Sequence, residues 1–240
     1  MKRFIRKFAR LLATKVMPEI AYPVLKGPLK GVKIIHGAMD GPSKGAGVYF
    51  NLIEQKQTNE FLRQVKKGNV VFDVGANVGY YTILASKRVG ENGIVFSFEP
   101  AVRNLAFLHN HIKLNKLKNV VILPFACAEQ STLRIFSFGP SIAQGHMEND
   151  SAIKKFDLIS NTFVQTVTID EFVHKSAVLP HIIKIDVEGS ELSVLNGARD
   201  TLMKCKPTIF LSIHSNELEI SCKEYLKNFS YQFILLYIAS

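Results

Sequence analysis

Three acidic residues stand directly after short apolar runs, where a carboxylate can bind a ligand or accept a proton. Asp73 closes the run VVFD, Glu99 follows IVFSF, and Asp186 closes IIKID. Apolar runs without polar alternation are typical of buried parallel strands. Since open parallel sheets bind their ligands at the carboxyl ends of the strands, we expect these carboxylates along one edge of a sheet.

The segment after Asp73 is a glycine turn. Gly75 and Gly79, four residues apart, let the backbone turn sharply and come close to a ligand. Helical spacing begins near Tyr80 and stops at Gly90. This order predicts the strand, turn and helix of a Rossmann-like nucleotide site, with the helix N-terminus facing the ligand.

The details of the turn favour S-adenosylmethionine (SAM) over NAD. The pattern is G-x-N-x-G, without the third glycine of a dinucleotide site. Asp73 would repel a pyrophosphate but would suit a ligand that carries an ammonium group. Glu99 follows Gly79 by twenty residues, a distance suited to binding ribose hydroxyls. The plainer alternative is a capped turn and an exposed glutamate.

A second set of polar residues follows two later strands. Asp186 and Glu188 stand beside a glycine, and His214 ends the apolar run PTIFLSIH. These residues can serve as general base, metal ligand or binder of a substrate hydroxyl. Helix capping is the alternative, and for Glu191 it is the favoured one. We take Asp186 as the first choice for the base and Glu188 or His214 as the next. No metal site is assigned, although a divalent ion held by the carboxylates is an alternative way to activate a hydroxyl.

Composition indicates one α/β domain with a basic extension. The chain has 240 residues, 47% of them hydrophobic, and a net charge of +10. All of this net charge lies in residues 1–67, and residues 68–240 are neutral. No nucleic-acid partner is therefore expected, although basic proteins often have one. The three cysteines are widely spaced, which indicates a reducing compartment.

The extension has two parts. Residues 1–17 predict a basic amphipathic helix that lies on an anionic membrane surface or a partner, or packs on the domain. Residues 18–47 are rich in Pro and Gly and predict a lid or an accessory ribbon. A helix capped at Thr58 or Asn59 should lead into the glycine-turn strand. We expect an extension over 1–67 and a catalytic domain over 68–240. The protein should be cytoplasmic, with or without peripheral contact to the inner face of a membrane.

The remaining elements complete an alternating pattern. We expect a helix after Pro100, a strand over 120–128, and a hairpin of 133–138 with 163–167 around a polar loop, 139–161, that serves as a substrate lid. A helix over 217–226 and a strand over 231–238 should close the chain.

Several of these motifs together resemble the FkbM-type SAM-dependent methyltransferases. VFDVGANVGYYT is similar to the family's first motif, FSFEPAVRNLAFLHNHIKLN to its second, and TIDEF to a short T-L-D segment. IIKIDVEGSELSVLNGA resembles the distinctive I-D-V-E-G-x-E-x-x-V-L-x-G-A motif. The resemblance covers residues 70–214 and implies methyl transfer from SAM to a hydroxyl of a sugar, polyketide or similar small acceptor.

The resemblance also implies a fold and a site. The fold is α/β, class I methyltransferase, Rossmann-like and doubly wound, mostly parallel with an antiparallel C-terminal strand, although the final hairpin is expected to be short or missing. Asp186 and Glu188 would face the acceptor, with His214 as a further catalytic candidate. The cofactor residues would be Asp73, Gly75, Ala76, Asn77, Gly79, Thr82, Glu99, Pro100 and, beside the adenine, Ala126.

Two other classes of function remain as alternatives. A nucleic-acid methyltransferase would suit the charge, but the chain has no N-P-P-Y-like or D-P-P-Y-like tetrapeptide. A membrane-attached binding module on a degenerate fold would suit the basic extension. Among acceptors, a sugar hydroxyl of a glycan or glycolipid is favoured, and the oligomeric state is not predicted.

Overall fold

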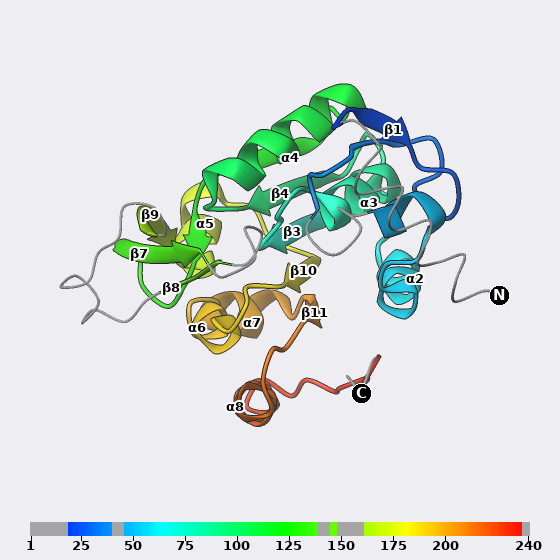
Figure 1. Cartoon of the computed structure of the whole chain (residues 1–240). Helices are drawn as coiled ribbons and strands as arrows, with labels where there is room; N and C mark the ends of the chain where they lie inside the picture. The colour runs from blue at the N-terminus through cyan, green and yellow to red at the C-terminus, as the bar shows by residue number, and fades with distance from the viewer. Residues whose placement is uncertain (1–18, 40–45, 139–144, 148–160, 237–240) are drawn as a thin grey trace.

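The computed structural model describes residues 19–39, 46–138, 145–147 and 161–236. Its centre is a parallel sheet of five strands in the order β11-β10-β3-β4-β5 (Figure 1). The strands are β3 (Val70–Val74), β4 (Ile94–Phe98), β5 (Val120–Leu123), β10 (Ile182–Ile185) and β11 (Thr208–Leu211). The order reverses between β3 and β10, because β4 and β5 extend the sheet one way and β10 and β11 the other. Ligands bind at such a switch point in open α/β sheets.

The two faces of the sheet carry separate hydrophobic cores, because alternate residues of a strand point to opposite faces. On one face, Val71 and Ile182 pack with α2 (Gln55–Gln64) and α3 (Tyr80–Val89). On the other, Phe72 and Ile183 pack with four helices. These are α5 (Ile169–Ser176), α6 (Glu191–Asn196), α7 (Arg199–Cys205) and α8 (Asn216–Lys227). The helix α4 (Val102–Leu114) connects β4 to β5.

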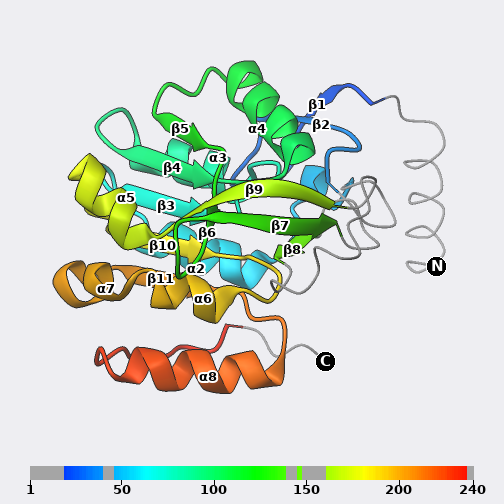
Figure 2. The ribbon, with the colours of Figure 1, turned by 90° about the vertical axis from the view of Figure 1, so that its left-hand side faces the viewer.

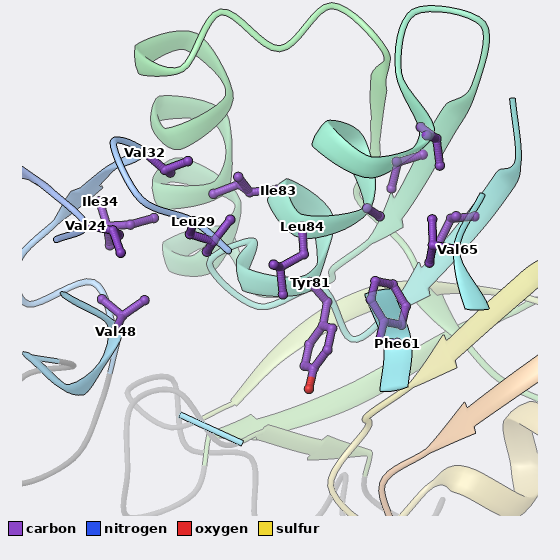
Figure 3. Close-up of a cluster of buried hydrophobic side chains, with 14 of the residues drawn as sticks. Val24, Leu29, Val32, Ile34, Val48, Phe61, Val65, Tyr81, Ile83 and Leu84 are labelled. Carbon is purple, nitrogen blue, oxygen red and sulfur yellow. The ribbon is translucent and has the colours of Figure 1, made fainter. Parts of the chain in front are cut away.

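The N-terminal segment forms the predicted ribbon. Strands β1 (Ala21–Pro23) and β2 (Lys33–Ile35) pair antiparallel, and a 3-10 helix, η1 (Ala46–Phe50), follows. Val24, Leu29 and Val48 share the first core with Ile83 of α3 (Figure 3). Residues 24–39 and 46–65 thus contribute to the core of the domain that carries the central sheet, while the domain boundary at 67/68 remains a prediction. The predicted helix over 1–17 lies outside the described residues.

The helix α2 begins earlier than predicted. Its N-cap is Glu54, and Thr58, the predicted cap, is fully buried inside the helix. The hydroxyl of Thr58 lies 3.2 Å from that of Tyr80, so a hydrogen bond to α3 explains why this threonine is buried inside the helix. The prediction that Thr58 or Asn59 caps the helix is therefore wrong.

A second, smaller sheet stands beside the end at which β3 and β4 finish (Figures 1 and 2). Its order is β6-β9-β7-β8. The strands are β6 (Ala126–Cys127), β7 (Leu133–Phe138), β8 (Gly145–Met147) and β9 (Asn161–Val167). The predicted pairing of 133–138 with 163–167 is confirmed. The segment expected to be a loop, 139–161, contains the short strand β8, and most of it lies outside the described residues.

The predicted strand over 120–128 is divided in two. Pro124 lacks an N–H group, so the ladder with β4 ends at Leu123. Ala126 and Cys127 instead pair with β9 in the second sheet. One apolar run thus passes from the central sheet to the smaller one.

The C-terminal segment differs from the prediction. The run that ends at His214 is a strand only to Leu211, and residues 231–236 form no strand. The hydroxyl of Tyr231 donates to the carbonyl of Pro207, which holds the start of this segment beside α7. Within the described residues, the central sheet therefore has no antiparallel strand. No helix among these residues is both long and apolar enough to cross a membrane.

Phe61 should be essential for holding α2 against the sheet. It is fully buried, and its ring centroid lies 5.2 Å from that of Tyr81 and 5.1 Å from that of Phe210. We expect Phe61→Ala to lower the free energy of unfolding in urea by about 3–5 kcal/mol, because it leaves a cavity. The matched control Phe50→Ala, at a side chain 51% exposed, should change it by less than about 1 kcal/mol. Equal losses would contradict this assignment.

Candidate functional site

The glycine turn after β3 is held between the ends of its two neighbouring strands. Gly75 has a φ of 78°, and a Cβ there would lie 2.0 Å from the carbonyl oxygen of Asp186. The amides of Gly75 and Ala76 both donate to the carbonyl of Phe98, at 3.0 Å each. Only glycine allows the turn to lie this close to the end of β10.

The same turn starts the helix α3. Gly79, the N-cap, has a φ of 98°, and a Cβ there would lie 2.6 Å from Cδ1 of Leu108. Asn77 also has a positive φ, 50°, and its Oδ1 accepts the amide of Val78 at 2.8 Å. The N-terminal amides of a helix have no intrahelical partner and favour electron-rich ligand atoms.

Glu99 is bound to this turn and is not an exposed glutamate. Its side chain is 4% exposed, and its Oε2 accepts the amide of Asn77 at 2.7 Å. Its Oε1 accepts the amide of Ala101 at 2.9 Å and the side-chain amide of Asn104 at 3.2 Å. Burial raises the pKa of Glu99, against the lowering effect of these bonds. A carboxylate oxygen can accept two bonds, so Oε2 has capacity for one further donor.

Asp73 lies beneath the turn, next to Thr82 of α3. It is 2% exposed and accepts the hydroxyl of Thr82 at 2.6 Å. Burial raises the pKa of Asp73 to about 6, although the Thr82 hydrogen bond and the charge of Lys184 act to lower it. Its carboxylate can therefore gain a proton under mildly acidic conditions.

The other two predicted cofactor residues lie further along the same edge. Pro100 is half-buried and directly follows Glu99. Ala126 is 8% exposed and begins β6, where the chain leaves the central sheet.

Asp186, Glu188 and His214, here termed the carboxylate–histidine cluster, lie together beyond β10 and β11. Nε2 of His214 lies 3.6 Å from Oδ1 of Asp186 and 3.4 Å from Oε2 of Glu188. One ligand atom from each residue lies within 4.8 Å of the other two, close enough for one divalent ion to be held among them. The three side chains are between 30% and 35% exposed, so an acceptor can reach them.

Glu191 does more than the predicted helix capping. It is fully buried at the start of α6, and its Oε1 lies 2.5 Å from Nδ1 of His214 and 3.0 Å from the amide of Gly189. The hydrogen bond with Glu191 raises the pKa of His214, burial opposes it, and the charges of Glu188 and Asp186 add to the rise. With Nδ1 held by Glu191, Nε2 is directed to the other two carboxylates.

One prominent residue of the site, Lys184, was missed by the sequence reasoning. It is fully buried within β10, and its Nζ donates to Oδ2 of Asp186 and to Oγ of Ser212, at 2.9 Å each. The signal was present, because Lys184 is the one charged residue in a run of isoleucines predicted to be a buried strand. A lysine is rarely buried unless it is paired.

A parallel sheet with a glycine turn at its switch point, and an acidic residue on the neighbouring strand, is typical of Rossmann-like α/β proteins. The chain belongs to the FkbM methyltransferase family, since the model of the methyltransferase FkbM domain matches residues 73–240. This match confirms the predicted family, and the parallel central sheet agrees with the predicted α/β class I methyltransferase fold.

Two relatives illustrate the similarity. The hexuronic acid methyltransferase AglP of Haloferax volcanii is 26% identical over 163 residues, which are 68% of this chain and 63% of AglP. The chain thus spans less than two thirds of that relative. The crystal structure of methyltransferase FkbM from Methylobacillus flagellatus KT superposes with a TM-score of 0.50 at 16% identity. That match covers 95% of this chain and 54% of the other, and it supports the fold alone.

The environment of His214 predicts its titration. An ordinary histidine has a pKa of about 6.5. Since the hydrogen bond to Glu191 raises the pKa of His214, its ring should lose its proton at a higher pH than that. Glu191→Gln should lower that pKa, because the amide carries no charge. The control is Glu217→Gln, at an exposed position in the first turn of α8. NMR titration of the imidazole measures the shift, and identical curves for Glu191→Gln and the unaltered protein would contradict the assignment.

Proposed function

We propose that this protein transfers the methyl group of SAM to a hydroxyl of a sugar acceptor. The observation that carries the proposal is the contact between the glycine turn and the end of β10. Gly75 and Asp186 touch through their backbones, so the predicted cofactor residues and the carboxylate–histidine cluster are neighbours at one switch point. The name of the relative AglP, a hexuronic acid methyltransferase, supports a sugar as acceptor.

The residues of the turn suit SAM. The remaining acceptor capacity on Oε2 of Glu99 suits a ribose hydroxyl, and the amides at the start of α3 suit a carboxylate. Asp73 supplies negative charge beneath the turn for an ammonium group. Gly75, Ala76, Asn77, Gly79 and Thr82 shape the turn, and Pro100 and Ala126 would border the rest of the cofactor. When bound, SAM supplies a methyl group on a sulfonium, which is already a good leaving group.

The protein has two remaining tasks, to align the acceptor oxygen and to remove its proton. We assign Nε2 of His214 as the atom that accepts the hydroxyl proton, because Glu191 holds Nδ1 and the Nε2 atom lies at the centre of the cluster. This choice replaces Asp186 as the first candidate, since one oxygen of Asp186 already accepts a bond from Lys184. Asp186 and Glu188 would then bind neighbouring hydroxyls of the acceptor and stabilise the imidazolium.

The direct test is a methyl-transfer assay with defined sugars. We expect S-adenosylhomocysteine and a methylated product with a glucuronic acid glycoside, with the matching glucoside as the comparison that lacks the carboxylate. Methylated product with the glucoside alone would support a sugar acceptor but would exclude a hexuronic acid as that acceptor. Transfer to RNA or DNA without transfer to any sugar would favour the nucleic-acid alternative. SAM binding without transfer to any acceptor would favour the binding module.

Glu99→Gln should weaken SAM binding. The substitution keeps the shape but removes the charge that strengthens hydrogen bonds to ribose, so we expect about a 10–100-fold loss of affinity. The control is Glu91→Gln, an exposed residue in the turn between α3 and β4. Calorimetric titration of SAM, and separately of NAD, measures both. Equal affinities in the two variants, or binding of NAD, would contradict the assigned site.

His214→Gln should lower kcat about 10²–10⁴-fold and leave the affinity for SAM unchanged. In the unaltered enzyme, kcat/KM should rise with pH through a pKa above about 6.5, because only the neutral imidazole accepts a proton. Glu191→Gln should move that rise to lower pH. Loss of activity in EDTA, restored by Mg²⁺ or Mn²⁺, would instead assign the cluster to a divalent ion.

Two further predictions concern partners. Peripheral contact with a membrane through residues 1–17 remains a prediction, because these residues lie outside the described part of the chain. A lipid-linked glycan would suit such a contact, since the acceptor and the basic segment would then meet at one surface.

A further inference from the structure

We propose that Lys184 is a positioning residue for methyl transfer, whose buried ammonium fixes the Asp186 carboxylate so that its Oδ1 atom faces the acceptor. The inference rests on the proposed function, because it concerns the same carboxylate–histidine cluster. Lys184 itself is fully buried and would touch neither SAM nor the acceptor.

The surroundings of Lys184 compensate for its charge. A buried ammonium is costly unless charged and polar partners surround it. Its Nζ has the Asp186 carboxylate and the Ser212 hydroxyl at 2.9 Å, and lies 4.8 Å from the centre of the Tyr81 ring. These three partners match the three N–H groups of an ammonium. Such pairing fixes the position of both partners.

Lys184 joins the ends of the two strands that carry the cluster. Asp186 directly follows β10 and Ser212 directly follows β11, two residues before His214. Because Oδ2 of Asp186 accepts from Lys184, the other oxygen, Oδ1, lies 3.6 Å from Nε2 of His214. The lysine therefore sets which oxygen of Asp186 is presented to the acceptor.

Lys184 also lies between the cofactor side and the acceptor side of the site. In the parallel pairing of β10 with β3, its register partner is Asp73. Its charge lowers the pKa of Asp73, whereas the charge of Asp186 raises it. One ammonium thus reduces the repulsion between the two carboxylates at the ends of adjacent strands.

A double-mutant cycle tests the proposal, with the glucuronic acid glycoside as acceptor. Lys184→Met keeps the length and the apolar stem, and we expect it to lower kcat about 10–100-fold at saturating SAM. If Lys184 acts through Asp186, then Lys184→Met combined with Asp186→Asn should be no slower than Asp186→Asn alone. A lysine that only supports the fold would give losses that multiply, and this result would overturn the proposal.

A second measurement does not depend on methyl transfer. His214 faces Asp186, Glu188 and Glu191, and Lys184 balances the charge of Asp186. In metal-free buffer, NMR should show the His214 ring losing its proton at higher pH in Lys184→Met than in the unaltered protein, and Asp186→Asn should abolish the difference. An unchanged titration would overturn the proposal even if the acceptor were not a sugar, while the expected shift without sugar methylation would reject only the acceptor.

Ser212→Ala keeps the test decisive if Lys184→Met does not fold. This substitution removes one partner of the ammonium and should lower kcat several-fold, with no additional loss in the Asp186→Asn background. Ser221→Ala, which removes a hydroxyl that donates to the helix carbonyl of Glu217, is the matched control and should leave kcat unchanged. Equal kcat in both serine variants would count against the positioning role.

Discussion

The close contact between the glycine turn and the end of β10 is the constraint on which the rest of the site depends. A side chain at Gly75 would overlap the carbonyl of Asp186, so the two strand ends can meet only because this residue has none. The contact lies where the strand order reverses, between β3 and β10. It brings the glycine turn, which is the proposed SAM site, next to the carboxylate–histidine cluster, which is the proposed acceptor site. Two groups that react with each other need such a fixed separation.

Buried charge is the second feature of this region. Asp73, Lys184 and Glu191 are all nearly or fully buried near the end of the sheet. Each has a specific partner: Thr82 for Asp73, Asp186 for Lys184, and His214 for Glu191. Fixed partners of this kind hold polar groups in one geometry, as the proposed proton transfer from an acceptor hydroxyl to His214 requires. The polar groups beneath the site thus determine the orientation of the exposed ones.

The sequence predicted the frame of the fold well where local pattern and burial agree. The apolar runs around Phe72, Phe96 and Ile183 are central strands, and the glycines at 75 and 79 form the turn. The predictions were wrong where a tertiary contact or one backbone group decides. Pro124 ends a strand, Thr58 lies inside a helix, and the residues 231–236 do not join the sheet. None of these outcomes changes the hydrophobic pattern from which the prediction was made.

By itself the sequence determined the class of the protein and the chemistry open to it. The reason is that strands, glycines and carboxylates follow one another along the chain in an order that a local pattern can identify. From their places after strands, it named Glu99 as a candidate for cofactor binding and Asp186 as the first candidate for the base. Only the tertiary structure decided how those groups are used. Glu99 is joined to the turn by Asn77, His214 is oriented by Glu191, and Asp186 is held by Lys184. Some of these partners come from other strands and helices. Others bind only because burial removes the water that would compete with them. Distance along the chain predicts neither effect.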